Sequence, residues 1–267
     1  MISQPTKIGI VAGGGALPRK LLAYCDSKHI ETFVVGLEGH TEPETVSARD
    51  HIITRIGAAG SIIKLFKDKG YKDLVIIGSV KRPKFSQMRP DWKTTLFFAK
   101  LGFRALGDDG LLKAVRAELE SEGFIIHGIQ DIMDGLLMPL GVIGAVTPSD
   151  DQYEDIRIGL NESRDIGERD VGQSVIVMNE DILGVEDEHG TNALIKRAGQ
   201  KGAILVKSAK PQQDRKLDMP TIGPQTIHAC ANMGYAGIAA EADGVLVVDR
   251  EETVALANQY NMFLVGV

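Results

Sequence analysis

Short apolar runs alternate with segments of helical periodicity along the first half of the chain. Strands are expected at 7–12, 32–37, 50–54 and 74–78. The first run has no polar face, which is typical of a parallel strand covered on both sides, and the fourth is also expected to be buried. Apolar positions recur at helical spacing in 17–29 and 58–69, between these runs. The alternation predicts an α/β domain with a parallel sheet and right-handed crossovers.

The pattern changes near Met138-Pro139-Leu140-Gly141, which we take as a domain boundary between 1–137 and 138–267. Before it, helices are expected at 91–106, 109–121 and 129–137, with a short strand at 124–127. Beyond it, strands at 173–178 and 182–185 flank a hairpin-type turn at 179–181. Further strands (203–207, 235–240, 244–248, 263–267) alternate with helices (191–198, 224–233, 250–259). We therefore predict a Rossmann-like parallel-sheet domain followed by an α/β domain with a mixed sheet.

Composition narrows the class of protein. The 267 residues are 43% hydrophobic and 25% charged, with a net charge of −6, which is ordinary for a soluble protein of two domains. The acidic balance argues against nucleic acid as a partner. Cys25 and Cys230 lie in apolar helical patterns and are expected to be buried free thiols in a reducing compartment. The chain lacks a signal-peptide pattern and any apolar run of about 18 residues, so we expect a cytoplasmic protein.

The stretch 207–223 carries the strongest chemical signal. It joins a strand to a helix and contains four cations and two carboxylates: Lys207, Lys210, Arg215, Lys216, Asp214 and Asp218. Cations suit phosphate oxygens, and Mg²⁺ is usually held by one or two carboxylates together with substrate phosphates. The stretch therefore indicates a phosphate and metal site, although a solvated loop with surface ion pairs would have the same composition.

A glycine loop, Gly13-Gly14-Gly15, follows the first strand and opens the first helix. Backbone N–H groups at such a position attract anions. The dinucleotide fingerprint is broken because Pro18 replaces its third glycine, yet Glu38 follows the second strand at the distance of a ribose-binding acid. Three interpretations stay open: a nicotinamide or flavin site, a tight turn without a ligand, and a phosphate contact of another kind.

Other candidates lie at strand ends and helix starts. Ser79, Lys81 and Arg82 follow the strand 74–78, at the edge where open α/β sheets bind ligands. Thr191 begins a helix after an acidic segment, where a capping role would also explain it. Trp92, Leu96 and Phe97 lie on an amphipathic helix; they could line an apolar cleft, but an ordinary core role is favoured.

Seven segments together resemble the UDP-2,3-diacylglucosamine pyrophosphatases of the LpxI type, over nearly the whole chain. They are Ile10-Val-Ala-Gly-Gly-Gly-Ala-Leu-Pro18, Gly78-Ser-Val-Lys-Arg-Pro83, Gly107-Asp-Asp109, Asp170-Val-Gly-Gln-Ser174, Val185-Glu186 with Gly190-Thr191, Val206-Lys207 with Lys210-Pro-Gln-Gln-Asp-Arg215, and Asp218-Met-Pro-Thr-Ile-Gly223. Each segment alone is weak, but their order and spacing are specific.

The resemblance implies a two-domain α/β enzyme of lipid A synthesis in Gram-negative bacteria, with the ligand between its domains. Such enzymes hydrolyse UDP-2,3-diacylglucosamine to lipid X and UMP with a divalent cation, Mg²⁺ or Mn²⁺. The essential aspartate of the family falls at Asp218, which is the expected catalytic residue and metal ligand, with Asp214 as a second metal ligand. The expected substrate-binding residues are Gly13, Gly14, Gly15, Ala16, Leu17, Ser79, Lys81, Arg82, Gln173, Thr191, Asn192, Lys207, Lys210, Gln213 and Arg215.

One segment departs from the family pattern. The family commonly has Glu-Gly-Thr-Asp where this chain has His189-Gly-Thr-Asn192, so two carboxylates are absent. This departure leaves a non-catalytic nucleotide or lipid carrier as an alternative, besides a dinucleotide-dependent oxidoreductase. The resemblance is compatible with peripheral contact with the inner membrane and with a homodimer, and the sequence decides neither.

Overall fold

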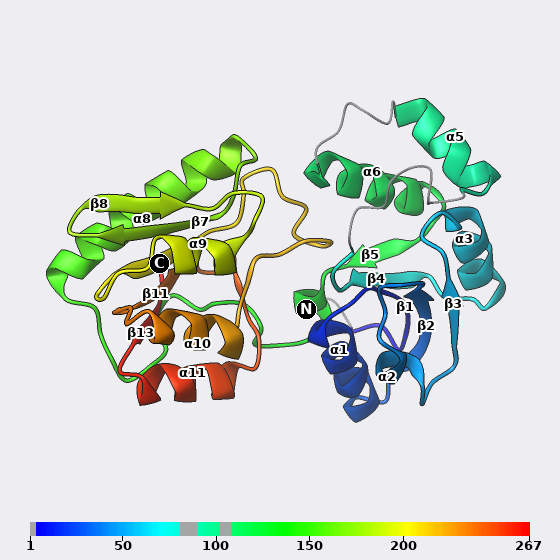
Figure 1. Cartoon of the computed structure of the whole chain (residues 1–267). Helices are drawn as coiled ribbons and strands as arrows, with labels where there is room; N and C mark the ends of the chain where they lie inside the picture. Colours follow the sequence, from blue (N-terminus) through cyan, green and yellow to red (C-terminus); the bar gives the residue numbers. More distant parts are fainter. Residues whose placement is uncertain (1–3, 81–89, 102–107) are drawn as a thin grey trace. The chain divides into compact units, whose positions relative to one another are not determined.

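The computed structural model describes residues 4–80, 90–101 and 108–267. The chain divides into two compact units, shown in Figure 1. The N-terminal unit is Met1–Met133 together with the short segment Asp214–Asp218, and the C-terminal unit is Asp134–Gln213 with Met219–Val267. Five residues that come late in the sequence thus belong to the N-terminal unit.

The N-terminal unit contains a five-stranded sheet of order β3-β2-β1-β4-β5, in which every pair is parallel. The strands are β1 (Lys7–Ala12), β2 (Glu31–Leu37), β3 (His51–Thr54), β4 (Asp73–Ile77) and β5 (Ile125–His127). The helices are α1 (Ala16–Ser27), α2 (Pro43–Val46), α3 (Ala59–Asp68), α5 (Trp92–Leu101), α6 (Asp108–Ser121) and α7 (Ile129–Ile132). The predicted parallel, Rossmann-like sheet is confirmed.

The core of this unit follows from the alternation of side chains along each strand. Phe33 and Val35 on β2 contact a cluster that includes Phe66 of α3 and Phe124, where the rings of Phe66 and Phe124 meet edge to face with centroids 6.4 Å apart. Leu217, from the late segment, packs against the same cluster. The segment Asp214–Asp218 is therefore attached to the N-terminal unit by apolar packing as well as by polar contacts.

The C-terminal unit contains a six-stranded sheet of order β6-β13-β11-β9-β7-β8 and a small parallel pair, β10 with β12. The strands are β6 (Gly141–Val142), β7 (Ser174–Met178), β8 (Asp181–Val185), β9 (Ile204–Lys207), β10 (Thr221–Ile222), β11 (Gly237–Ala240), β12 (Leu246–Val247) and β13 (Phe263–Gly266). Strands β9, β11 and β13 are parallel, whereas β6, β7 and β8 pair antiparallel with their neighbours. The predicted mixed sheet is confirmed.

Helices cover both faces of this sheet: α8 (Asp150–Glu168) on one face, and α9 (Thr191–Arg197), α10 (Pro224–Asn232) and α11 (Arg250–Gln259) on the other (Figure 1). Successive strand residues supply the two faces in turn. Leu205 packs in the cluster with α9 and α10, while Ile204 and Val206 pack in the cluster with Ile156 of α8. Burial on both faces explains why these strands are continuous apolar runs.

Local signals set several boundaries. Ser149 caps α8: its hydroxyl accepts a hydrogen bond from the Gln152 N–H at 3.3 Å, and the Gln152 side chain accepts one from the Ser149 N–H. Asn179 and Glu180 both have positive φ, 53° and 64°, as a two-residue turn of the predicted hairpin requires. The short elements α2, β6 and β10 were not predicted, because two to four residues are too few to show a period.

Two apolar side chains of α5 differ from the favoured expectation of core packing. Trp92 is 76% exposed and Leu96 is 41% exposed, so a core role is wrong for both. Phe97 is half-buried. The helix therefore presents apolar surface outward in the part of the chain that the structure describes.

Candidate functional site

A buried lysine ends strand β9 of the C-terminal unit. Lys207 is only 6% exposed, and its Nζ donates a hydrogen bond to the Thr191 hydroxyl at 3.0 Å. Thr191 is the first residue of α9, directly after Gly190, whose φ is 79°. A lysine is rarely buried unless polar partners surround it. The strand end and the helix start thus form one polar site, which brings together two predicted site residues.

Glu186 organises this polar site. It is 7% exposed; its Oε1 accepts a hydrogen bond from the Thr191 hydroxyl at 2.6 Å, and its Oε2 accepts one from the Gln173 N–H at 3.0 Å. The hydroxyls of Ser174 and Thr191 lie 3.3 Å apart. Hydrogen bonds to a carboxylate are stronger than neutral ones. One carboxylate therefore fixes the main chain at Gln173 and orients the hydroxyl that contacts Lys207.

The Gln173 side chain has a buried acceptor. Its Oε1 is buried and has no hydrogen-bond partner among the residues that the structure describes. Buried polar atoms are nearly always paired in native proteins. An unpaired acceptor on a residue whose main chain is held by Glu186 is the kind of group that a polar ligand or a bound water satisfies.

Three other predicted residues of the C-terminal unit lie nearby in sequence but have different surroundings. Lys210 forms an ion pair with Asp170, 2.6 Å from Nζ to Oδ1. Gln213 is buried, and its Oε1 accepts a hydrogen bond from the Lys210 N–H at 3.2 Å. Asn192 follows Thr191 and is exposed. Lys210 and Gln213 therefore shape the loop after β9, whereas Asn192 is open to a ligand.

The late segment of the N-terminal unit is held by its first carboxylate. Asp214 is 7% exposed, and both of its oxygens accept from Nη1 of Arg116 on α6, at 3.1 and 3.2 Å. Its Oδ1 also accepts from the Lys216 N–H at 3.0 Å. In addition, the Gln130 amide donates to the Arg215 carbonyl at 2.8 Å. The polar partners of Asp214 give it an anchoring role in this structure.

Asp218 ends the same segment. Its N–H donates to the Asp214 carbonyl at 2.9 Å, and the residue is half-buried. Within the described ranges, no group of three or more His, Cys, Asp or Glu side chains is placed to hold a metal ion. Mg²⁺, however, commonly takes one or two protein carboxylates and completes its shell with phosphates and water. A single partly exposed carboxylate at Asp218 fits that kind of binding.

The glycine loop and the end of β4 meet in the N-terminal unit. The Gly14 N–H donates to the Ser79 carbonyl at 2.9 Å, and the Ser79 N–H donates back to the Gly14 carbonyl at 2.8 Å. Gly13 and Gly14 are buried, Gly15 and Ala16 are exposed, and Leu17 is half-buried. The structure thus brings the loop and Ser79 together as expected, while Lys81 and Arg82 lie outside the described residues.

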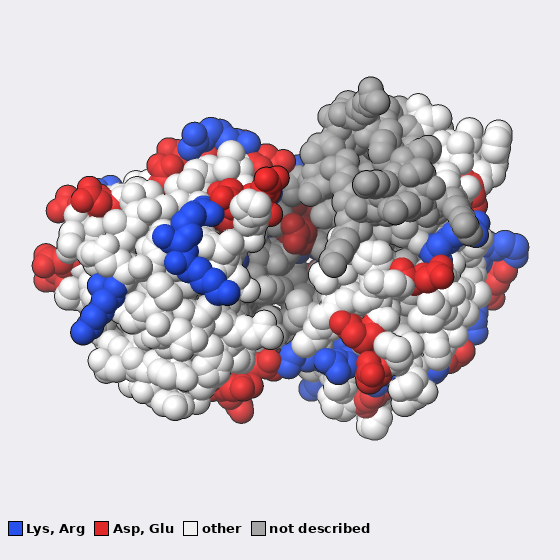
Figure 2. Space-filling view, in the orientation of Figure 1, with Lys and Arg blue, Asp and Glu red and all other residues white. Residues whose placement is uncertain are grey.

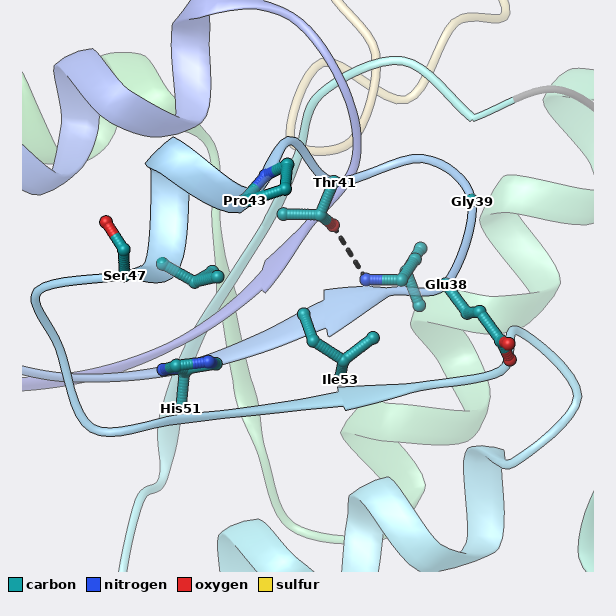
Figure 3. A pocket seen from close by; sticks show the side chains of 9 residues that line it. Glu38, Gly39, Thr41, Pro43, Ser47, His51 and Ile53 are labelled. Atoms are coloured by element: carbon teal, nitrogen blue, oxygen red, sulfur yellow. Dashed lines mark hydrogen bonds between the residues drawn. The ribbon is translucent and has the colours of Figure 1, made fainter.

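A cavity of about 380 Å³ lies beside strands β2 and β3 (Figure 3). Its nine lining residues are Leu37, Glu38, Gly39, Thr41, Pro43, Val46, Ser47, His51 and Ile53. The short helix α2 covers this part of the sheet incompletely, since Ile53 is 50% exposed. The cavity contains none of the predicted site residues, although Glu38, the residue considered for ribose binding, lies on its wall.

The surface in view mixes charges of both signs over each unit (Figure 2). Ion pairs between residues close in sequence include Arg157 with Glu154 and Lys64 with Asp68. Among the helices of the described residues, none combines the length and apolar character that crossing a bilayer requires.

Together these features define a class: a protein of two α/β units, with a buried lysine–hydroxyl–carboxylate site in one and an anchored aspartate segment in the other, suited to an anionic ligand. Comparison with known proteins gives the family. The family model of the LpxI N-terminal domain matches residues 7–136, and that of the LpxI C-terminal domain matches residues 139–265.

A curated relative agrees with both matches. The UDP-2,3-diacylglucosamine pyrophosphatase LpxI of Caulobacter vibrioides is 36% identical to this chain over an alignment of 273 positions. The alignment covers 98% of this chain and 97% of the relative. This chain therefore belongs to the LpxI family, and the resemblance inferred from its motifs is confirmed.

Three residues that matter in these sites were not predicted to belong to them: Glu186, Arg116 and Glu42, whose Oε1 accepts from the Gly15 N–H. Glu186 is separated from Thr191 by only five positions, and it lies within one of the segments that match the family, which was a usable signal. Arg116 lies 98 positions from Asp214, and Glu42 lies 27 positions from Gly15. Such pairings depend on the tertiary fold and leave no local trace in the sequence.

Proposed function

We propose that this protein hydrolyses the pyrophosphate bond of UDP-2,3-diacylglucosamine, which yields UMP and 2,3-diacylglucosamine 1-phosphate, in lipid A biosynthesis. The observation that carries the proposal is the match to an LpxI pyrophosphatase over 98% of the chain. The buried Lys207, Thr191 and Glu186 site supports it, because it supplies a cation and a hydroxyl of the kind that phosphate oxygens bind.

In the proposed reaction, water attacks one phosphorus and forms a new P–O bond. The bond from that phosphorus to the bridging oxygen breaks, and the bridging oxygen leaves with the other phosphate group. Lys207 would stabilise charge that builds on the phosphoryl oxygens, assisted by Arg215 and Lys210. Thr191 and Asn192 would orient the phosphate groups, and the orphaned Oε1 of Gln173 would accept from the substrate. Ser79 and the exposed edge of the glycine loop would contact the uridine part.

A divalent cation, Mg²⁺ or Mn²⁺, is proposed as cofactor, and Asp218 is the residue that would hold it. When bound, the ion would neutralise pyrophosphate charge and lower the pKa of the attacking water. Asp214 stays a predicted second ligand of the ion. Because its carboxylate is buried against Arg116, we propose that it also positions Asp218, whose N–H donates to the Asp214 carbonyl.

The acyl chains of the substrate need apolar contacts. We propose that Trp92 and Leu96 of α5 supply them, because both side chains are exposed and exposed large apolar groups favour lipid contact. The protein would act in the cytoplasm, with peripheral contact at the inner membrane made through its acylated substrate. A homodimer is compatible with this proposal.

The test is the release of UMP from UDP-2,3-diacylglucosamine by the pure protein, with EDTA and then with Mg²⁺ or Mn²⁺ restored. We expect equal amounts of UMP and 2,3-diacylglucosamine 1-phosphate, abolished by EDTA and recovered with metal. Folded protein that binds the substrate tightly and releases no UMP with either metal would contradict the proposal. That outcome would favour a carrier. The observation behind this alternative is that His189–Asn192 lacks the two carboxylates that the family commonly has there.

A further inference from the structure

The N-terminus of α1 is a position where α/β proteins commonly bind phosphate, because a glycine loop there directs backbone N–H groups outward. In this chain, one of those donors is already engaged. The Gly15 N–H donates to Oε1 of Glu42 at 2.9 Å, and Oε2 of the same carboxylate is buried. A carboxylate of the chain itself therefore accepts the hydrogen bond that this donor could give to a phosphate oxygen.

The glycines of the loop are explained by internal contacts. A Cβ at Gly13 would lie 2.7 Å from the Ser79 carbonyl oxygen, and a Cβ at Gly14 would lie 2.8 Å from the His40 carbonyl oxygen. Gly15 has a φ of 91°, which favours glycine. Each glycine is thus required for the close approach of neighbouring main chain or for the turn, and none of them requires a ligand.

Glu42 is held in place by the residues on either side. The Thr41 hydroxyl accepts a hydrogen bond from the Leu37 N–H at 2.7 Å, drawn in Figure 3, and donates one to the Ala12 carbonyl at 2.5 Å. After Glu42, Pro43 begins α2, and the Thr45 N–H donates to the Glu42 carbonyl at 3.0 Å. The carboxylate is therefore supplied by a fixed connection from β2 and not by a loose surface side chain.

The charge of Glu42 fits its position. Hydrogen bonding by the Gly15 N–H lowers the pKa of this carboxyl, and the nearby Arg19 lowers it further. The group is consequently an anion at neutral pH, and an anion is stabilised at a helix N-terminus.

We propose that Glu42 is a built-in anion that occupies the Gly15 N–H, so that this donor of the glycine loop does not bind a phosphate group of a ligand. The loop then acts as a support: it fixes Ser79 at the end of β4 through paired backbone hydrogen bonds. This inference stands apart from the proposed hydrolysis, since it concerns binding of inorganic phosphate and needs no turnover.

The test follows the Gly15 amide by NMR in the full-length ¹⁵N-labelled protein while inorganic phosphate replaces chloride at constant ionic strength. In the wild-type protein we expect no saturable shift of Gly15. Glu42→Ala should gain one, because the freed N–H and Arg19 would then bind phosphate. The matched control is Glu44→Ala, which removes an exposed carboxylate two residues away and should behave as the wild type.

Two results would overturn the proposal: a saturable Gly15 shift in the wild-type protein, or no shift in a Glu42→Ala protein whose other amide signals are native. If Glu42→Ala does not fold, Glu42→Gln serves instead. Its neutral carbonyl still accepts from the Gly15 N–H, but the charge is gone, so a weaker saturable shift is expected. An unchanged Gly15 in folded Glu42→Gln would then count against the proposal.

Discussion

Both units place a glutamate beside the start of a helix, and the two glutamates have different partners. In the C-terminal unit, Glu186 binds the Thr191 hydroxyl, which in turn contacts Lys207. In the N-terminal unit, Glu42 binds the backbone N–H of Gly15. The first carboxylate supports side chains that can meet a phosphate, whereas the second occupies a backbone position that a phosphate would use.

This difference shows why a motif alone does not locate an anion site. The glycine loop has the residue types of a phosphate loop, yet its donor at Gly15 is satisfied from within. The buried site matches no general phosphate-binding fingerprint, yet it contains a lysine and a hydroxyl, and Gln173, whose main chain Glu186 holds, has an orphaned amide oxygen. Whether a donor is already paired decides its availability to a ligand.

The largest loss of activity is expected from Asp218→Ala, and the losses from changes at Glu186 and Glu42 are compared with it. Loss of the proposed metal-binding carboxylate should lower kcat by at least about 100-fold, as removal of one group that stabilises the transition state does, while substrate binding persists. Steady-state UMP release and equilibrium binding would measure this. The control is Asp181→Ala, an exposed carboxylate on β8; near-wild-type turnover by Asp218→Ala would rule out the assignment.

Lys207→Met should come next. It keeps the length and apolar character of the side chain but removes the cation, so kcat/KM should fall by about 100-fold. Thr191→Val removes the hydroxyl that links Lys207 to Glu186. We expect kcat/KM to fall by about tenfold, because the lysine would be misplaced. The control Lys201→Met removes an exposed lysine. If Lys207→Met and Lys201→Met have equal kcat/KM values, the buried site is not the phosphate site.

Arg116→Met tests whether the late segment is anchored to the N-terminal unit. It leaves Asp214, which is 7% exposed, without its cation, so the free energy of unfolding should fall by about 2 kcal/mol. Urea unfolding would measure the loss. In the double variant with Asp214→Asn the uncompensated charge is gone, so part of the loss should return; strictly additive losses would show that the pair is not coupled.

The smallest expected effect is on the pH dependence of stability, and it comes from Glu122, a third glutamate whose partners are surface lysines. Hydrogen bonds from Lys67, and then Lys93, lower the pKa of Glu122 to about 2 from 4.5. Because the pKa of Glu122 is lower in the folded state than in the unfolded state, its contacts with the two lysines stabilise the fold above about pH 4.5. This stabilisation is lost as the pH falls toward about 2.

Glu122→Gln should therefore unfold with a shallower dependence on pH between about 5 and 3 than the wild type. Urea midpoints at several pH values would show it, with Glu252→Gln on the exposed side of α11 as the control. The same slope in Glu122→Gln and the wild type would mean that the lysines do not stabilise the charged form.

Much of the fold could be predicted from the sequence, because strands such as β1, β4 and β9 are buried on both faces and appear as unbroken apolar runs. The hairpin turn at Asn179 was also visible. Contacts between distant segments were not: the attachment of Leu217 to the N-terminal core depends on packing. For the site, residue types indicated the right stretches, but which donors and acceptors are already paired appears only in three dimensions.

The most direct measurement of the central comparison is kcat/KM for UMP release by Glu186→Gln and Glu42→Gln, side by side with the wild type. Each change removes one charge and keeps a carbonyl acceptor. We predict a loss of about tenfold or more for Glu186→Gln, because the single amide carbonyl oxygen can replace only one of the two carboxylate oxygens that accept from Thr191 and from the Gln173 N–H. For Glu42→Gln we predict a change within about threefold. A larger loss in Glu42→Gln than in Glu186→Gln would contradict the account.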